Sequence, residues 1–117
     1  MLSILVVEDN LLARTATKFL FKSFTCTLDF AQTGKETLKL LEKKHYDVVF
    51  LDLGLPDIEG IELIKKIRKN KKNSHLRIAV LTAHNDPQYK NSSVTAGADR
   101  FYTKPLRAEN IEEMLSI

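Results

Sequence analysis

The sequence predicts an α/β fold in which a doubly wound, five-stranded parallel sheet is covered by five helices. Five short runs of apolar and β-favouring residues alternate with segments of helical periodicity. Runs such as 4–7 are continuously apolar, which is typical of strands buried on both faces. The length of 117 residues suits one compact domain, so we expect residues 1–117 to form a single domain.

The five apolar runs give the expected strands. They lie at 4–7, 25–30, 47–51, 76–81 and 100–103. Right-handed crossovers between parallel strands place helices on both faces of the sheet. Ligands of such folds bind beyond the carboxyl ends of the strands, so the residues that follow each strand are the candidates for a site.

The first two helices carry N-terminal capping signals. Asn10 can cap a helix whose apolar residues we expect to face the core, and the segment 33–36 (Thr-Gly-Lys-Glu) has the pattern of a capping box. The expected inner residues of the first helix are Leu12, Ala16, Phe19 and Leu20, and those of the second are Leu38 and Leu41.

The remaining helices follow the loop 54–60 and the last two strands. Asp86 followed by Pro87 predicts an N-cap and a first helical position. The inner faces of the third and fifth helices are marked by Ile61, Ile64 and Ile67, and by Ile111, Met114 and Leu115.

The composition is that of an ordinary globular protein, with 44% hydrophobic and 28% charged residues and a net charge of +3. No apolar run approaches the roughly 18 residues of a membrane span, and the start lacks the basic flank of a signal peptide. We therefore expect a cytoplasmic domain that makes no membrane contact itself. The single cysteine, Cys26, excludes an internal disulfide and a cysteine metal cluster, and we expect a buried thiol.

Charged and polar residues follow four of the expected strands. Glu8 and Asp9 follow the first strand, Asp52 the third, Thr82 the fourth and Lys104 the fifth. The carboxyl ends of parallel strands meet at one edge of the sheet. We therefore expect three carboxylates, a hydroxyl and an ammonium group to converge there.

Three carboxylates held together require protonation or a cation. Two unit charges about 4 Å apart repel by roughly 4 kcal/mol at an effective dielectric constant near 20. Oxygen ligands without cysteine or histidine favour a hard divalent ion, Mg²⁺ or Mn²⁺. A carboxylate oxygen left free by the metal is a nucleophile for phosphoryl transfer, and a nearby hydroxyl and ammonium can bind the phosphoryl oxygens.

Four strings carry a resemblance to a known family. LVVEDN, VVFLDLGLPDIEG, AVLTAH and AGADRFYTKPL follow one another with the order and spacing of response-regulator receiver domains. The resemblance runs from residue 4 to about residue 114. It implies the CheY-like and flavodoxin-like strand order 2-1-3-4-5 and a role as phosphoacceptor in two-component or phosphorelay signalling.

The resemblance implies a role for each residue of the strand-end group. Asp52 matches the phosphoacceptor, and Glu8 and Asp9 match the acidic pair that holds Mg²⁺, with the backbone carbonyl of Gly54 as a further ligand. Thr82 matches the switch hydroxyl.

The same comparison extends to the loop after the last strand. Lys104 matches the lysine that contacts the phosphoryl group, and Pro105 follows it in the family through a cis peptide bond. Phe101 stands at the switch aromatic position, with a plain core residue as the alternative. Gly54 and His84 follow Asp52 and Thr82 by two positions, and we hypothesise that they set the lifetime of the phosphorylated state; an idle surface residue is the alternative for His84.

The implied partners are a histidine kinase or a histidine phosphotransfer domain, and then a downstream protein or a phosphorylation-dependent homodimer. The DLGLPD string slightly favours the receiver of a hybrid histidine kinase, which would place the domain on the cytoplasmic side of a membrane-bound protein. The largest basic run predicts a solvated face and no direct nucleic-acid contact; it consists of Lys65, Lys66, Arg68, Lys69, Lys71 and Lys72.

Two other classes remain as alternatives to a signalling module that is not itself an enzyme. One is a Mg²⁺-dependent aspartyl phosphatase or phosphotransferase on a similar sheet, which would need a second aspartate at position 54, where the chain has glycine. The other is a nucleotide-binding flavodoxin-like domain, against which the absence of a glycine-rich loop after the first strand argues.

Overall fold

All five expected strands are present and form one parallel sheet. The computed structural model describes residues 1–83 and 87–117, and the order of the strands is β2-β1-β3-β4-β5. Their bounds are β1 Leu2–Val7, β2 Cys26–Ala31, β3 Val48–Asp52, β4 Arg77–Thr82 and β5 Arg100–Thr103. The predicted strand order is confirmed.

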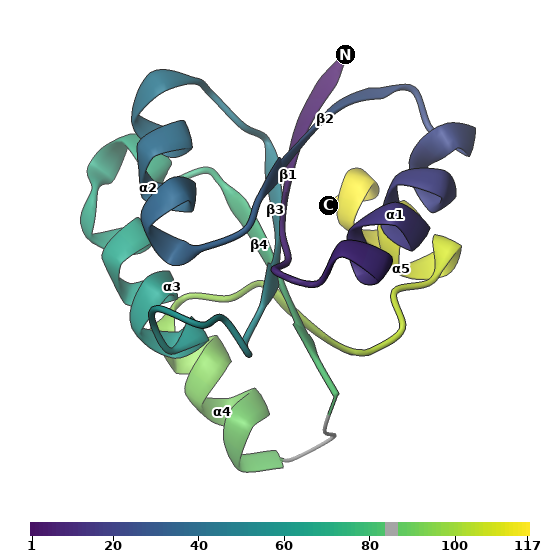
Figure 1. The fold of residues 1–117 in the computed structure, drawn as a ribbon. Coiled ribbons are helices and arrows are strands. Elements are labelled where there is room, and N and C mark those ends of the chain that lie inside the picture. Colours follow the sequence, from purple (N-terminus) through teal and green to yellow (C-terminus); the bar gives the residue numbers. More distant parts are fainter. Residues whose placement is uncertain (84–86) are drawn as a thin grey trace.

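Helices cover both faces of the sheet. One face carries α1 and α5, and the other carries α2, α3 and α4 (Figure 1). The bounds are α1 Leu11–Leu20, α2 Gly34–Lys43, α3 Gly60–Lys69, α4 Pro87–Ala96 and α5 Ala108–Ser116, with short 3₁₀ helices at Phe21–Ser23 and Lys71–Asn73. The doubly wound α/β architecture with five helices is therefore confirmed.

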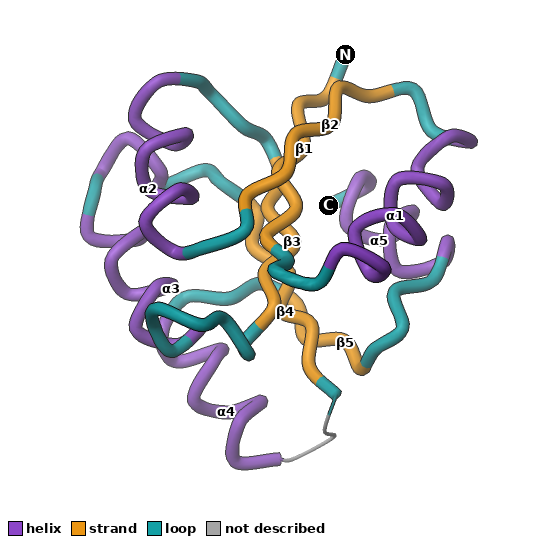
Figure 2. The backbone as a smooth tube through the Cα atoms, in the orientation of Figure 1, coloured by secondary structure: helices purple, strands orange, loops and turns teal. Residues whose placement is uncertain are grey.

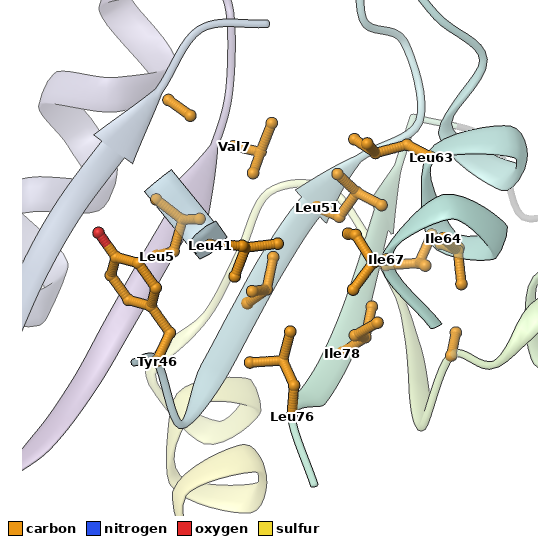
Figure 3. Packing of buried hydrophobic residues seen from close by; sticks show 14 residues of the cluster. Leu5, Val7, Leu41, Tyr46, Leu51, Leu63, Ile64, Ile67, Leu76 and Ile78 are labelled. Atoms are coloured by element: carbon orange, nitrogen blue, oxygen red, sulfur yellow. The ribbon is translucent and has the colours of Figure 1, made fainter. Parts of the chain in front are cut away.

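Alternate residues of each central strand enter two separate cores. In β1, Leu5 and Val7 join the cluster under α2 and α3, whereas Ile4 and Val6 join the cluster under α1 and α5. Figure 3 shows the first cluster, in which Ile67 of α3 and neighbouring side chains pack against the sheet. The strands are continuously apolar because both of their faces are buried.

The predicted N-caps are seen on the first two helices. The Asn10 side chain accepts a hydrogen bond from the Ala13 N–H at 3.0 Å, and the Thr33 hydroxyl accepts one from the Glu36 N–H at 3.1 Å. The structure thus shows the Thr33 half of the expected capping box. The N-cap predicted at Asp86 lies outside the described residues.

The predicted inner face of α1 is wrong. Leu12 and Phe19 are 81% and 72% exposed, Ala16 is exposed, and only Leu20 is half-buried. The inward face of the helix instead contains small residues, among them the half-buried Ala13 and Thr17. Leu20 is the α1 residue that packs against the cluster under α1 and α5, and the large residues Leu12 and Phe19 face solvent.

One residue of the basic run departs from the predicted solvated face. Arg68 does not share the solvated face of its lysine neighbours, since its side chain is only 20% exposed. It donates hydrogen bonds to the carbonyls of Gly97 and Asn73 and to the Asp99 carboxylate, and so ties α3 to the segment before β5.

The Cys26 thiol, which was expected to be buried, is half-buried, and burial raises its pKa. In the described segments, the helices are too short or too polar to cross a membrane.

Candidate functional site

Because the five strands are parallel, the loops that follow them, drawn in teal in Figure 2, leave the sheet at its carboxyl edge. Asp52 and Thr82 are the last residues of β3 and β4, and both are buried. Glu8 and Asp9 directly follow β1, and Lys104 directly follows β5. The topology thus brings together the residues predicted for this edge.

Lys104 links two of the carboxylates. Its ammonium nitrogen lies 2.9 Å from Asp52 Oδ2 and 3.0 Å from Glu8 Oε1. Its backbone N–H donates to the Thr82 carbonyl at 2.7 Å, which joins the loop after β5 to the end of β4. Lys104 therefore provides the positive charge that partly neutralises the acidic group.

The acidic group can hold a divalent cation. One carboxylate oxygen from each of Glu8, Asp9 and Asp52 lies within 4.8 Å of the others. Glu8 and Asp52 are buried, whereas Asp9 is exposed to solvent. An all-oxygen set with one open side fits a hard divalent ion that keeps part of its water shell.

The electrostatics of the group reflect burial and pairing. Burial raises the pKa of Glu8 above its usual value, and the hydrogen bond from Lys104 opposes that rise. Burial alone would lower the pKa of Lys104, but its hydrogen bonds to Asp52 and Glu8 raise it. Lys104 is therefore firmly protonated while it bridges the two acids.

A cavity of about 340 Å³ opens beside Asp52. Its lining includes Gly54, Thr82 and Lys104, and also the side chain of Tyr89 on α4. A Cβ atom at position 54 would meet only Asp52 Oδ1, at 3.6 Å, so the glycine leaves the approach to the carboxylate open. The cavity has room for a tetrahedral group on Asp52.

The other predicted residues are Gly54, Phe101, Pro105 and His84. The Gly54 N–H donates to Asp52 Oδ1 at 3.0 Å. Phe101 is half-buried, pairs in register with Val80 and packs against the cluster under α2 and α3. The peptide bond between Lys104 and Pro105 is cis. His84 lies outside the described residues.

Three further residues with structural contacts were not expected from the sequence. Arg14 donates to the backbone carbonyls of Glu8 and Asp9, and Asp57 accepts hydrogen bonds from the N–H groups at the start of α2. Tyr89 lines the cavity. The contacts of Arg14 and Asp57 are to backbone groups, which leave no mark on the spacing of residues in the sequence.

Comparison with known proteins supports the same assignment. A family described as the response regulator receiver domain matches residues 4–116. The transcriptional regulatory protein PhoP of Escherichia coli is 39% identical over 108 residues, which cover 92% of this chain and 48% of PhoP. The hybrid signal transduction histidine kinase A of Dictyostelium discoideum is 30% identical over 116 residues, which cover 96% of this chain and 5% of that kinase. The chain thus spans about half the length, or less, of these relatives.

Solved structures share the whole fold. The response regulator TrrA of Thermotoga maritima, solved in complex with Mg²⁺-BeF, is 34% identical and superposes with a TM-score of 0.84 over 99% of this chain and 97% of its own. The receiver domain of Ssk1 from Saccharomyces cerevisiae, solved with the histidine phosphotransfer protein Ypd1, is 25% identical with a TM-score of 0.88 over 98% of this chain and 86% of that one.

The resemblance seen in the four sequence strings is therefore confirmed by the fold and by the family match. The match spans nearly the whole chain, and the acidic group, the hydroxyl and the lysine lie at one edge of a sheet with the expected strand order. The chain belongs to the response regulator receiver domain family of two-component and phosphorelay signalling.

Proposed function

We propose that residues 1–117 act as one receiver domain in which Asp52 accepts a phosphoryl group. The observation that carries this proposal is the pairing of a buried Asp52 with Lys104, beside the carboxylates of Glu8 and Asp9 and below an open cavity. A carboxylate held between a cation site and an ammonium group is suited to attack phosphorus.

The proposed metal is Mg²⁺, with Mn²⁺ as a substitute. Glu8, Asp9 and Asp52 would hold it with their carboxylates, and the carbonyl of Gly54 would be a further ligand. When bound, the ion neutralises charge on the carboxylates and on the phosphoryl oxygens. Support comes from the oxygen-only set of side chains and from TrrA, which was solved with Mg²⁺-BeF.

In the proposed transfer, a carboxylate oxygen of Asp52 forms a bond to phosphorus. The bond from phosphorus to the donor histidine nitrogen breaks at the same centre, and the nitrogen keeps the electron pair. Lys104 moves its hydrogen bond from the carboxylate to a phosphoryl oxygen, and Thr82 and the Gly54 N–H donate to the others.

We propose that the added charge of about −1.5 to −2 drives a switch through Thr82 and Phe101. Thr82 shifts toward the phosphoryl group, and the half-buried Phe101 turns into the space that is vacated. Changing the ratio of the active to the inactive conformation from 1:99 to 99:1 requires about 5.5 kcal/mol of differential stabilisation. A few charge-assisted hydrogen bonds of about 1.5–3 kcal/mol each are sufficient. The face formed by α4 and β5 then binds a downstream protein or a second copy.

The proposed donor is a histidine phosphotransfer domain or a histidine kinase. Leu11, Leu12 and Phe19 are exposed on α1, which begins directly after the acidic pair. An apolar helix face beside the reacting carboxylate offers a docking surface for the helices that carry the donor histidine. Ssk1 was solved with such a partner, Ypd1.

The proposed setting is cytoplasmic, without membrane or nucleic-acid contact by this domain. We propose that the chain reacts only on itself, by taking up and losing the phosphoryl group, with Gly54 and His84 influencing the rate of loss. An aspartyl phosphatase that turns over external esters would need a second acid at position 54, where the cavity is lined by glycine.

The test is intact mass after incubation with Mg²⁺ and acetyl phosphate. Wild type should gain one phosphoryl group, and Asp52→Asn should gain none while it keeps its fold by circular dichroism. A normal yield in Asp52→Asn would refute the acceptor assignment. A gain that continues unchanged in EDTA would refute the metal assignment.

A further inference from the structure

Arg14, in the second turn of α1, contacts the backbone that carries both members of the acidic pair. Its Nη1 donates to the Glu8 carbonyl at 3.0 Å and to the Asp9 carbonyl at 2.9 Å. Its own N–H donates to the Asn10 carbonyl at 3.0 Å, as part of the first helical turn. One half-buried guanidinium therefore fastens two successive peptide groups to a rigid helix.

The two acids of the pair are held differently. The Glu8 carboxylate is bound at both oxygens, by Lys104 at 3.0 Å and by the Asn10 N–H at 3.2 Å. The exposed Asp9 carboxylate accepts no hydrogen bond from the segments 1–83 and 87–117. Its position toward Glu8 and Asp52 is therefore set by the backbone of residue 9, and this backbone is the group that Arg14 contacts.

We propose that Arg14 is a positioning residue for the divalent cation, and that it acts by holding the Asp9 carboxylate in place. The inference rests on the proposed cation site. Outer groups that orient metal ligands typically change metal affinity by about 10- to 100-fold when they are removed. Arg14 acts through Asp9 and does not itself touch the cation or the phosphoryl group.

Loss of the Arg14 charge and loss of its positioning role should change Mg²⁺ affinity in opposite directions. A guanidinium near the site repels a cation, so loss of the charge alone would tighten metal binding. Loss of positioning would weaken it. Weaker Mg²⁺ binding in a neutral variant is therefore opposite in sign to the effect of the lost charge, as loss of positioning requires.

The test measures Mg²⁺ binding by isothermal titration calorimetry in Arg14→Ala, Arg14→Gln and Arg14→Lys. Arg14→Ala should bind Mg²⁺ about 10-fold or more weakly than wild type. Arg14→Gln and Arg14→Lys, which keep a donor, should fall between the two. Lys18→Ala removes a charge one turn further along the same helix and should bind Mg²⁺ like wild type.

Phosphorylation by acetyl phosphate separates positioning from general damage. The Mg²⁺ concentration for half-maximal rate should rise in Arg14→Ala, while the rate at saturating Mg²⁺ should return to the wild-type value. Equal or tighter Mg²⁺ binding in Arg14→Ala would overturn the inference. So would a reduced rate that saturating Mg²⁺ does not restore. Should Arg14→Ala fail to fold in EDTA, Arg14→Gln decides by the same criteria.

Failure of the inference is distinct from failure of the proposed function. A wild-type chain that neither binds Mg²⁺ nor gains a phosphoryl group would refute the function. A wild-type chain that does both, beside an Arg14→Ala chain with unchanged Mg²⁺ affinity, would refute only the role of Arg14.

Discussion

Lys104 is the residue that ties the acidic group together before any phosphoryl group is bound. It contacts both Asp52 and Glu8, and these contacts raise its pKa. A group that must leave one partner in order to bind another can couple a local reaction to a wider change. We therefore expect Lys104 to couple phosphorylation to the proposed switch.

Lys104→Ala should separate phosphorylation from switching. Phosphorylation by acetyl phosphate should be slower by up to about 100-fold, since one electrostatic group is lost, but should still occur. The spectral shifts of the phosphorylated wild type, measured by ¹H–¹⁵N NMR, should be missing from the variant. Identical shifts in both proteins would contradict this role.

Asp57 holds the loop after β3 to the start of α2. Its carboxylate accepts hydrogen bonds from the Gly34 N–H at 2.9 Å and the Lys35 N–H at 3.1 Å. The Gly34 N–H, together with that of Lys35, lowers the pKa of Asp57 below its usual 3.8. A carboxylate near a helix N-terminus is also favoured by the helix dipole.

The pH dependence of stability should therefore change in Asp57→Ala. A lowered native pKa stabilises the fold fully above the usual pKa of 3.8, and this stabilisation is lost as the pH falls through the lower native value. Urea midpoints should be lower for Asp57→Ala than for wild type at pH 7, and the two should converge below pH 3.8. A difference that stays constant through this range would show that Asp57 does not act through its charge.

The residues at the strand ends could be predicted from the sequence, whereas the side chains that hold the neighbouring loops in place could not. Asp52 and Thr82 end runs of apolar residues, so their place at the sheet edge follows from the topology. Arg14 and Asp57 act on peptide groups in neighbouring segments. Which peptide group a side chain reaches depends on how loops pack, and residue spacing does not contain that information.

Among the elements, α1 is the one that the apolar pattern misplaced. A stripe of large apolar residues normally faces the core. Here Leu12 and Phe19 face solvent, and the inward face includes Ala13 and Thr17. Large apolar residues on the outer side of a helix do not stabilise the core, and such exposed apolar residues are typical of surfaces that bind a partner.

Replacing Leu12 and Phe19 by serine should change donor use without reducing stability. Exposed positions contribute within about 0.5 kcal/mol, so urea midpoints should stay close to wild type. Phosphotransfer should be measured from the phosphorylated histidine phosphotransfer protein or kinase that phosphorylates wild type fastest. The rate should fall by 10-fold or more, which corresponds to a loss of about 1.4 kcal/mol in docking free energy.

Acetyl phosphate provides the matched control for this double variant, because a small donor needs no docking face. Its rate should be unchanged. Equal slowing with both kinds of donor would mean that the substitutions disturb the acidic pair next to α1, and the docking role would then be rejected.

At the scale of the whole molecule, the fold followed from the alternation of apolar runs with helical segments. The continuous apolar run 4–7 predicted a strand buried on both faces, and β3 is likewise buried along its whole length. The two cores then formed on opposite sides of the same strands. The alternation of apolar runs with helical segments does not determine how α1 is rotated about its own axis.

Mg²⁺ should stabilise the whole domain through the site. A ligand that binds only the folded chain adds about 2.7 kcal/mol at 100 times its dissociation constant. The urea midpoint of wild type should therefore rise with Mg²⁺ and fall back in EDTA. Asp9→Asn should remove most of this response, and an undiminished response would place the cation elsewhere.

The outward face of α1 also has an evolutionary consequence. Since Leu12 and Phe19 are largely absent from the core, substitutions there are free of the stability threshold that constrains buried positions. If α1 binds the phosphodonor as proposed, duplicated copies of such a gene can change which donor they accept at little cost in folding stability. The exposure of these two residues would then allow parallel pathways to become insulated from each other.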